Sequence, residues 1–159
     1  MGNIILIGMP GCGKTVVGAL LAPMLGLTFV DLDHNIEAFA GKKIPQIFTE
    51  EGEMNFRKRE TVALREVTKK SAQVIASGGG IVTQAENHEI LRAGGQIVFL
   101  KRPIHKLARK GRPLSGGDLT QMYQIRLPLY ESLADFIVES GETPEKTAEH
   151  IAHVLEGEK

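Results

Sequence analysis

Short apolar runs alternate with longer amphipathic segments along most of the chain. Each apolar run ends at a glycine, a serine or a charged residue, and runs of this length that are apolar throughout are typical of strands buried on both faces. We predict five such strands, over Asn3–Ile7, Thr28–Val30, Val74–Ala76, Gln96–Leu100 and Phe136–Val138.

The segments between these runs carry helical patterns. In Lys14–Leu25 the apolar residues recur at helical spacing, and Gly26 follows as a C-terminal stop. Residues 33–70 carry only helical patterns, with breaks predicted at Gly41, Pro45 and Gly52. The remaining predicted helices are Glu86–Arg92, Ile104–Arg109, Leu119–Leu133 with a distortion at Pro128, and Pro144–Leu155 with Thr143 as its N-cap.

This alternation of strands and helices predicts the fold class. It is typical of an α/β fold, here a five-stranded parallel sheet flanked by helices on both faces. Ligands bind such sheets at the carboxyl ends of the strands, and several glycine-rich and acidic stretches of this chain fall there. With 159 residues, the chain is expected to form a single domain over residues 1–159.

Composition excludes several classes of partner. The formal net charge is zero, so no overall field favours nucleic acid or an anionic membrane. No apolar run is long enough to span a membrane and no signal-peptide pattern is present, so we expect a cytoplasmic protein. We also expect a monomer. Cys12 is the single cysteine and cannot form an internal disulfide. His150 and His153 lie one helical turn apart without a third ligand in view, and are expected to face solvent.

Residues 8–15 read GMPGCGKT and match the phosphate-binding pattern G-x-x-x-x-G-K-[ST] in full. The match follows a predicted strand and opens a predicted helix, which is the context that the pattern requires. Glycines let consecutive backbone N–H groups turn toward phosphate oxygens, and the positive end of the following helix points to the same place. We therefore expect this P-loop to bind a nucleoside triphosphate, through Gly11, Cys12, Gly13, Lys14, Thr15 and Val16.

Within this loop, individual side chains have distinct expected roles. Lys14 should reach the β- and γ-phosphates, and Thr15 should offer its hydroxyl to Mg²⁺. Cys12 is expected to fill space, since nothing nearby supports a redox role.

Two acids follow the second predicted strand, in Asp31-Leu32-Asp33. On an extended segment their carboxylates would point in similar directions, so one could serve the metal and the other could accept a proton from a substrate hydroxyl. Asp33 could equally cap the next helix. A GTPase would need a base-reading N-K-x-D segment, and the chain has none.

Five further motifs follow the P-loop, and in this order they resemble the shikimate kinase family. The likeness extends from Gly8 to about Pro144, and the motifs are Asp31-x-Asp33, Phe56-Arg57-x-x-Glu60, Gly78-Gly79-Gly80, Arg112-Pro113-Leu114 and Arg126-x-Pro128-Leu129-Tyr130. The resemblance implies a P-loop NTPase fold of the nucleoside-monophosphate-kinase type with a short mobile lid. It also implies ATP-dependent phosphorylation of the 3-hydroxyl of shikimate, with Mg²⁺, on the way to the aromatic amino acids.

The same resemblance implies roles for residues in the acid pocket. Asp33 would hold the ring hydroxyls and act as the base, while Asp31 would hold Mg²⁺ directly or through water. Arg57 and Arg126 would bind the substrate carboxylate, with Glu60 orienting Arg57. Gly79 and Gly80 would present backbone N–H groups to the substrate.

Physical chemistry is consistent with these roles but does not impose them. Shikimate is a small anion with several hydroxyls, and the planar guanidinium fork of arginine suits its carboxylate. From sequence alone, Arg57 and Arg126 could also be exposed arginines, and residues 78–80 could be a flexible turn. Three glycines at the end of a strand are nevertheless typical of a close approach of a ligand to the backbone.

A basic segment, Lys101–Gly117, holds six Lys/Arg residues and no acid, and its part at about 109–118 is the predicted lid. Arg112 would reach the transferring phosphoryl group, and Arg109 resembles the residue that stacks on adenine, with Pro144 near the opposite face. The spacings around Arg112 are short for the family, so we expect differences in lid closure and adenine contacts.

Two rival functions remain open at this point. One is another small-molecule P-loop kinase, acting for instance on gluconate or a nucleotide. The other is a regulatory domain that binds ATP without phosphoryl transfer. The first would not need both arginines and the glycine triplet, and the second would not need Asp33, Lys14 and Arg112 together.

Overall fold

The computed structural model describes residues 2–107 and 119–157. Its centre is a five-stranded sheet in the order β2-β3-β1-β4-β5, in which every neighbouring pair is parallel. The strands are β1 (Ile4–Ile7), β2 (Thr28–Asp31), β3 (Gln73–Ala76), β4 (Gln96–Lys101) and β5 (Phe136–Glu139). The predicted number, positions and direction of the strands are confirmed.

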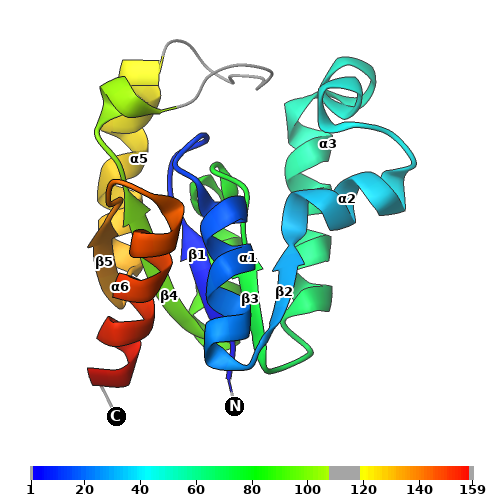
Figure 1. Cartoon of the computed structure of the whole chain (residues 1–159). Coiled ribbons are helices and arrows are strands. Elements are labelled where there is room, and N and C mark those ends of the chain that lie inside the picture. The colour runs from blue at the N-terminus through cyan, green and yellow to red at the C-terminus, as the bar shows by residue number, and fades with distance from the viewer. Residues whose placement is uncertain (1, 108–118, 158–159) are drawn as a thin grey trace.

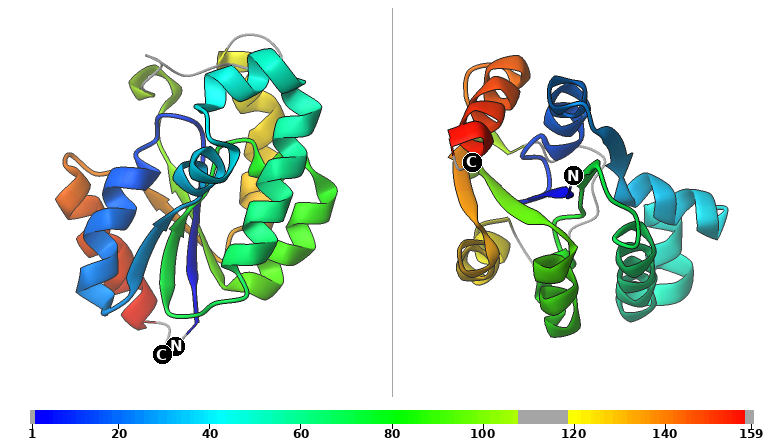
Figure 2. Two further views of the ribbon diagram at one scale, coloured as in Figure 1. Left: turned by 90° about the vertical axis from the view of Figure 1, so that its right-hand side faces the viewer. Right: turned by 90° about the horizontal axis from the view of Figure 1, so that it is seen from below.

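Helices cover both faces of this sheet. Figure 2 (right) shows α1 and α6 on one face and α3, α4 and α5 on the other, while α2 projects beyond the β2 edge. Both termini lie at the end of the molecule away from the P-loop (Figure 1). The helices are α1 (Lys14–Leu25), α2 (Leu32–Ala40), α3 (Ile44–Val67), α4 (Ala85–Gly94), α5 (Leu119–Leu133) and α6 (Pro144–Gly157).

The central strand β1 explains why the sequence reads as continuous apolar runs. All four of its residues are buried, and Ile5 is paired with Ile75 on one side and Ile97 on the other. Because neither face of the sheet meets water, alternation of polar and apolar residues is absent. The buried sheet is the rigid platform that positions the loops at its carboxyl edge.

Two helix ends follow local sequence signals. Gly26 adopts a left-handed conformation (φ 69°) and its N–H donates to carbonyl oxygens at the end of α1, as a C-terminal glycine does. At the start of α6, the Thr143 hydroxyl accepts a hydrogen bond from the Lys146 N–H at 3.1 Å. Both predicted boundaries are confirmed.

The segment between β2 and β3 differs from the prediction at one break. Gly41 ends α2 in a left-handed conformation (φ 73°), but Pro45 breaks nothing, because it lies in the first turn of α3, where its missing N–H has no partner to lose. Gly52 interrupts α3 internally with φ 83° and ψ 166°. The Arg59 guanidinium bridges that interruption, since it contacts both carboxylate oxygens of Glu51 at 2.8 and 3.0 Å.

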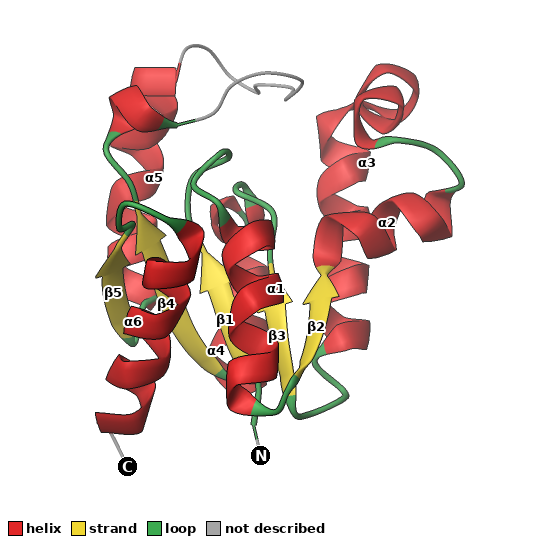
Figure 3. Ribbon diagram, in the orientation of Figure 1, coloured by secondary structure: helices red, strands yellow, loops and turns green. Residues whose placement is uncertain are grey.

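Beyond β4 the described part of the expected helix at Ile104–Arg109 holds a 3₁₀ turn over Ile104–Lys106. The predicted lid, including Arg109 and Arg112, lies outside the described residues. The α5 helix continues through Pro128 as one helix. Figure 3 shows strands, helices and loops separately and makes the alternation along the chain visible.

None of the helices in the described part of the chain is long and apolar enough to cross a membrane. Within the described ranges no three His, Cys, Asp or Glu side chains gather as a metal site built from such side chains alone would require. His150 and His153 are both exposed on α6, as expected.

Candidate active site

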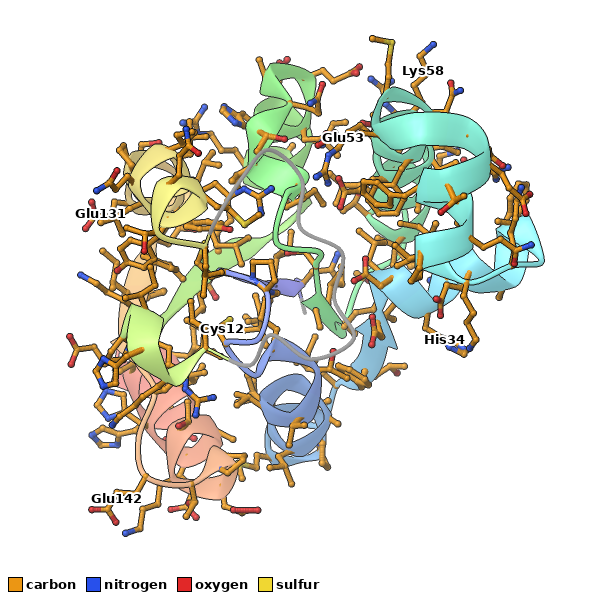
Figure 4. The ribbon with its side chains drawn as sticks, turned by 90° about the horizontal axis from the view of Figure 1, so that it is seen from above. Cys12, His34, Glu53, Lys58, Glu131 and Glu142 are labelled. Atoms are coloured by element: carbon orange, nitrogen blue, oxygen red, sulfur yellow. The ribbon has the colours of Figure 1, made fainter. Side chains whose placement is uncertain are left out.

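A cleft of about 420 Å³ opens at the carboxyl ends of the strands. Its walls come from the P-loop, the β2–α2 junction, α3, the glycine loop after β3, and α5. Figure 4 looks down on this end, with Cys12 near the middle and Lys58, Glu131 and Glu142 at the outer edge of the molecule in this view. Of the residues assigned to the site from sequence, those that line the cleft are Gly11, Gly13, Lys14, Thr15, Val16, Asp31, Asp33, Arg57, Glu60, Gly79, Gly80 and Arg126.

The P-loop is shaped by left-handed glycines and by its lysine. Gly11 (φ 82°) and Gly13 (φ 98°) adopt conformations that side chains disfavour. The Lys14 ammonium spans the loop and donates to the carbonyl oxygens of Gly8 at 2.7 Å and Met9 at 3.1 Å. Cys12 is buried, and its side chain fills space beneath the loop rather than lining the cleft.

At the end of β2, Asp31 joins the P-loop to the start of α2. One carboxylate oxygen accepts a hydrogen bond from the Thr15 hydroxyl at 3.1 Å, and the other accepts from the backbone N–H groups of Asp33 at 3.1 Å and His34 at 3.4 Å. Asp31 is therefore the N-cap of α2. The alternative that Asp33 caps this helix is wrong, because the chain becomes helical at Leu32.

The same geometry corrects how the two acids come together. They do not alternate on an extended segment, since Asp31 ends the strand and Asp33 lies in the first turn of the helix. Both nevertheless line the cleft. The paired oxygens of Thr15 and Asp31 are the hard donors that Mg²⁺ prefers, so these two residues fit a magnesium site. Asp33 remains separate from that pair.

Arg57 and Glu60 form a buried ion pair on α3. Their side chains are 9% and 1% exposed, and Arg57 Nη1 lies 3.1 Å from Glu60 Oε1. Arg57 Nη2 also lies 3.2 Å from Glu53. The adjacent Lys58 is exposed and points outward at the edge of the molecule (Figure 4), so Arg57 is the inward-facing member of this basic pair. Arg57 is not an exposed helix residue.

Burial shapes the electrostatics of this pair. It raises the pKa of Glu60 from 4.5 to about 7, with the Asp33 carboxylate acting in the same direction and Arg57 opposing. Arg57 Nε and Glu60 Oε2 have no hydrogen-bond partner among the described residues. Buried polar atoms of this kind are expected to be satisfied by a ligand or by water.

The glycine loop is shaped by the same side chains. A Cβ atom on Gly80 would overlap the Arg57 guanidinium. One on Gly78 would lie 2.7 Å from Glu60 Oε2 and 2.9 Å from Asp33 Oδ1. The groups that approach these glycines in the structure are the protein's own side chains, and the approach of a ligand to the loop stays a prediction.

Gly79 faces the P-loop and α5 instead. A Cβ atom here would lie 2.6 Å from Pro10 Cδ. Its carbonyl oxygen accepts a hydrogen bond from the hydroxyl of Tyr130 on α5. One turn earlier on the same helix, Arg126 is 5% exposed and lines the cleft, so it is not an exposed arginine either.

Several cleft residues were not assigned a role from sequence. They form the wall provided by α2 and α3, and are His34, Glu37, Ile44, Pro45 and Phe48. No short motif marks them, and only the order of the helices could have placed them here. Pro144, expected near adenine, begins α6 and is not among the residues that line this cleft.

The fold and the site together define a P-loop kinase of small molecules, in which a phosphate-binding loop and a pocket holding two buried arginines share one cleft. The family model of shikimate kinase matches residues 10–156. The chain belongs to the shikimate kinase family.

Individual relatives agree with this assignment. The shikimate kinase of Nitrosomonas europaea is 45% identical over 150 residues, which are 88% of this chain and 71% of that protein. The shikimate kinase of Pseudomonas paraeruginosa is 43% identical over 154 residues, 91% of this chain and 90% of that protein.

Solved structures show the same relationship. The shikimate kinase from Acinetobacter baumannii in complex with shikimate matches with a TM-score of 0.93 at 40% identity, over 100% of this chain and 95% of that one. The shikimate kinase from Aquifex aeolicus matches with a TM-score of 0.87 at 31% identity, over 98% of this chain and 97% of that one. A sugar kinase from Janibacter, at 19% identity and a TM-score of 0.59, shares the fold alone.

Proposed function

We propose that the protein transfers the γ-phosphoryl group of ATP to the 3-hydroxyl of shikimate, giving shikimate 3-phosphate and ADP for aromatic amino-acid biosynthesis. Family membership supports the reaction. The observation that carries the choice of acceptor is the placement of Arg57 and Arg126, both buried, on opposite walls of the cleft that also holds the P-loop. Two guanidinium groups at one site favour a carboxylate-bearing substrate.

On the nucleotide side, the P-loop backbone and Lys14 hold the phosphates. Lys14 donates to two loop carbonyls, which holds its ammonium at the loop and supports a role for it at the β- and γ-phosphates. Thr15 and Asp31 would hold Mg²⁺, which would neutralise negative charge on the phosphates. The backbone groups of Gly11, Cys12, Gly13 and Val16 complete the proposed phosphate site.

On the acid side, Arg57 and Arg126 bind the carboxylate and Asp33 binds the ring hydroxyls. As the new bond between the substrate oxygen and the γ-phosphorus forms, the bond to the β,γ-bridging oxygen breaks and ADP leaves. Asp33 accepts the proton of the attacking hydroxyl. Glu60 orients Arg57 through the 3.1 Å contact, and the Gly79 and Gly80 N–H groups bind the substrate.

Two roles rest on the sequence resemblance alone. Arg112 stabilises charge on the transferring phosphoryl group, and Arg109 stacks on adenine with Pro144 nearby. The arginines belong to the lid at about 109–118, within one domain over 1–159 whose helical segment at about 33–70 binds the substrate. Substitution of Arg112 by Ala is expected to lower kcat with little change in shikimate affinity.

A coupled ADP-release assay with MgATP and a panel of acceptors tests the function. Turnover with shikimate, and none with gluconate or a nucleoside monophosphate, is expected. Preferential turnover with another acceptor would indicate a different small-molecule kinase, and ATP binding without any turnover would indicate a regulatory domain. We also propose a cytoplasmic monomer without nucleic-acid or membrane partners, which light scattering on the purified protein checks for oligomeric state.

A further inference from the structure

Tyr130 is a fully buried phenol at the back of the cleft. It lies on α5, is 0% exposed, and stacks on Phe99 of β4 with ring centroids 5.0 Å apart. A buried tyrosine needs a partner for its hydroxyl, because an unpaired polar group in the interior is unfavourable.

The partner is a single peptide group of the glycine loop. The Tyr130 hydroxyl donates to the Gly79 carbonyl oxygen at 2.5 Å. That oxygen belongs to the same planar peptide as the Gly80 N–H. A hydrogen bond that fixes the carbonyl therefore also fixes the direction of the Gly80 N–H.

The neighbouring peptides of the loop are held differently. The Gly78 carbonyl accepts from the Ile81 N–H at 3.3 Å, and the Gly80 carbonyl accepts from Thr83 through its N–H at 3.0 Å and its hydroxyl at 2.7 Å. These bonds are local turns. The middle peptide, by contrast, is held by a residue distant in sequence, and glycines on both sides give it wide conformational freedom otherwise.

The N–H groups of Gly79 and Gly80 are not used in the backbone turns of this loop. Among the backbone hydrogen bonds between described residues, none has the Gly79 or Gly80 N–H as its donor. Both glycines line the cleft. The directions of these two N–H groups are therefore fixed by their own peptides, because the carbonyl oxygen of each peptide already accepts a hydrogen bond.

Tyr130 is also connected to the second acid-binding element. Arg126 lies one turn earlier on α5 and is close enough to the Tyr130 hydroxyl to lower its pKa, although burial outweighs this and raises the pKa above 10. The hydroxyl therefore stays protonated and keeps its donor role at every physiological pH. It lies between the Arg126 guanidinium and the Gly79 carbonyl.

We propose that Tyr130 is a positioning residue for the acid substrate, which aims the Gly80 N–H into the cleft by holding the Gly79–Gly80 peptide. This inference rests on the proposed binding of shikimate by that loop. Tyr130 is not among the residues that line the cleft, and it acts through the glycine peptide and Arg126.

The test is Tyr130→Phe, which removes only the hydroxyl and keeps the ring on Phe99. The matched control is Tyr123→Phe on the same helix, at the only other tyrosine of the chain. We expect the KM for shikimate to rise about tenfold in Tyr130→Phe, because a carbonyl loses its donor and the peptide is free to turn. The KM for ATP should stay within about twofold, and Tyr123→Phe should match the wild type.

A merely structural role would give a different pattern. Equal changes in both KM values, or an unchanged KM for shikimate with a lower melting temperature, would overturn the inference. Shikimate turnover by the wild type and by Tyr123→Phe tests the proposed function separately. If those proteins turn over shikimate normally and Tyr130→Phe does so with the same KM, only the positioning role is refuted.

A second measurement needs no variant. In isotope-labelled wild-type protein, the Tyr130 hydroxyl proton should be protected from exchange with solvent. Its resonance and that of the Gly80 amide should shift together when shikimate is added. A Gly80 amide that shifts while the hydroxyl proton exchanges freely would overturn the proposal.

Discussion

At the scale of single residues, most of the proposed chemistry depends on a few side chains in the cleft. Asp33, the proposed base, can be tested most directly. Asp33→Asn keeps the size of the side chain and removes the base. We expect kcat to fall about 100-fold or more while ATP binding is retained. The matched control, Asn35→Ala, changes an exposed residue of the same helix that does not line the cleft. Steady-state kinetics and calorimetric ATP binding check both, and a near-normal kcat in Asp33→Asn would remove it as the base.

Arg126 tests the recognition of the carboxylate. In Arg126→Lys a point charge replaces a planar fork, so we expect the KM for shikimate to rise about tenfold or more with a smaller change in kcat. Arg65→Lys makes the same exchange at an exposed position outside the cleft. If both variants leave the KM for shikimate unchanged, Arg126 does not bind the acid.

The raised pKa of Glu60 predicts that the stability of the folded protein depends on pH. The pKa of about 7 in the folded protein lies above the ordinary 4.5, so between these values the folded state holds a proton that the unfolded state has lost. The free energy of unfolding should therefore fall as pH rises from about 4.5 to 7, by at most about 3 kcal/mol, and this contribution should be constant above that window.

Urea unfolding of wild type and Glu60→Gln at pH 5 and pH 8 checks this. The glutamine variant lacks the titration, so the wild type should lose more stability than the variant between the two pH values. Parallel behaviour of the two proteins would contradict the raised pKa.

At the scale of elements, α3 contains one glycine in a backbone conformation that other residues disfavour. Gly52 interrupts the helix at φ 83°, and a Cβ atom there would meet nothing within 4 Å. Gly52→Ala should therefore destabilise the fold by about 1–2 kcal/mol through backbone conformation alone. Gly157→Ala, where space is also open but φ is not left-handed, should change stability little. Thermal unfolding distinguishes the two, and equal effects would contradict the argument.

Elements were largely predictable because their signals are local. The buried strands, the boundaries of α1 and the Thr143 cap depend on neighbours within a few residues. The alternative that Asp33 caps α2 was wrong, because the choice of cap depends on where the chain leaves the sheet, and Asp31 is still paired with Ala76 of β3.

Contacts between elements could not be predicted from sequence patterns. The motif resemblance assigned Arg57, Glu60 and the glycines to one site. It did not show that the Arg57 guanidinium leaves no room for a side chain at position 80. The hydrogen bond from Tyr130 to Gly79 joins residues 51 positions apart, and nothing local to either residue indicates the other. Such contacts follow from the order of strands in the sheet.

For the whole molecule, one parallel sheet brings two kinds of site to one edge. The P-loop follows β1, the acids follow β2 and the glycine loop follows β3, and these three strands are neighbours. The phosphate-binding N–H groups of the P-loop and the acid-binding side chains therefore share a cleft without any long loop to connect them. This topology is what makes direct transfer between ATP and a bound hydroxy acid feasible.

The central claim is that this cleft transfers phosphate to the substrate rather than to water. Phosphorus NMR of the protein with MgATP and shikimate tests it most directly. The account predicts a new phosphomonoester resonance, coupled to the ring proton at carbon 3 of shikimate, that grows in step with ADP. Release of ADP with inorganic phosphate as the only other product would contradict it.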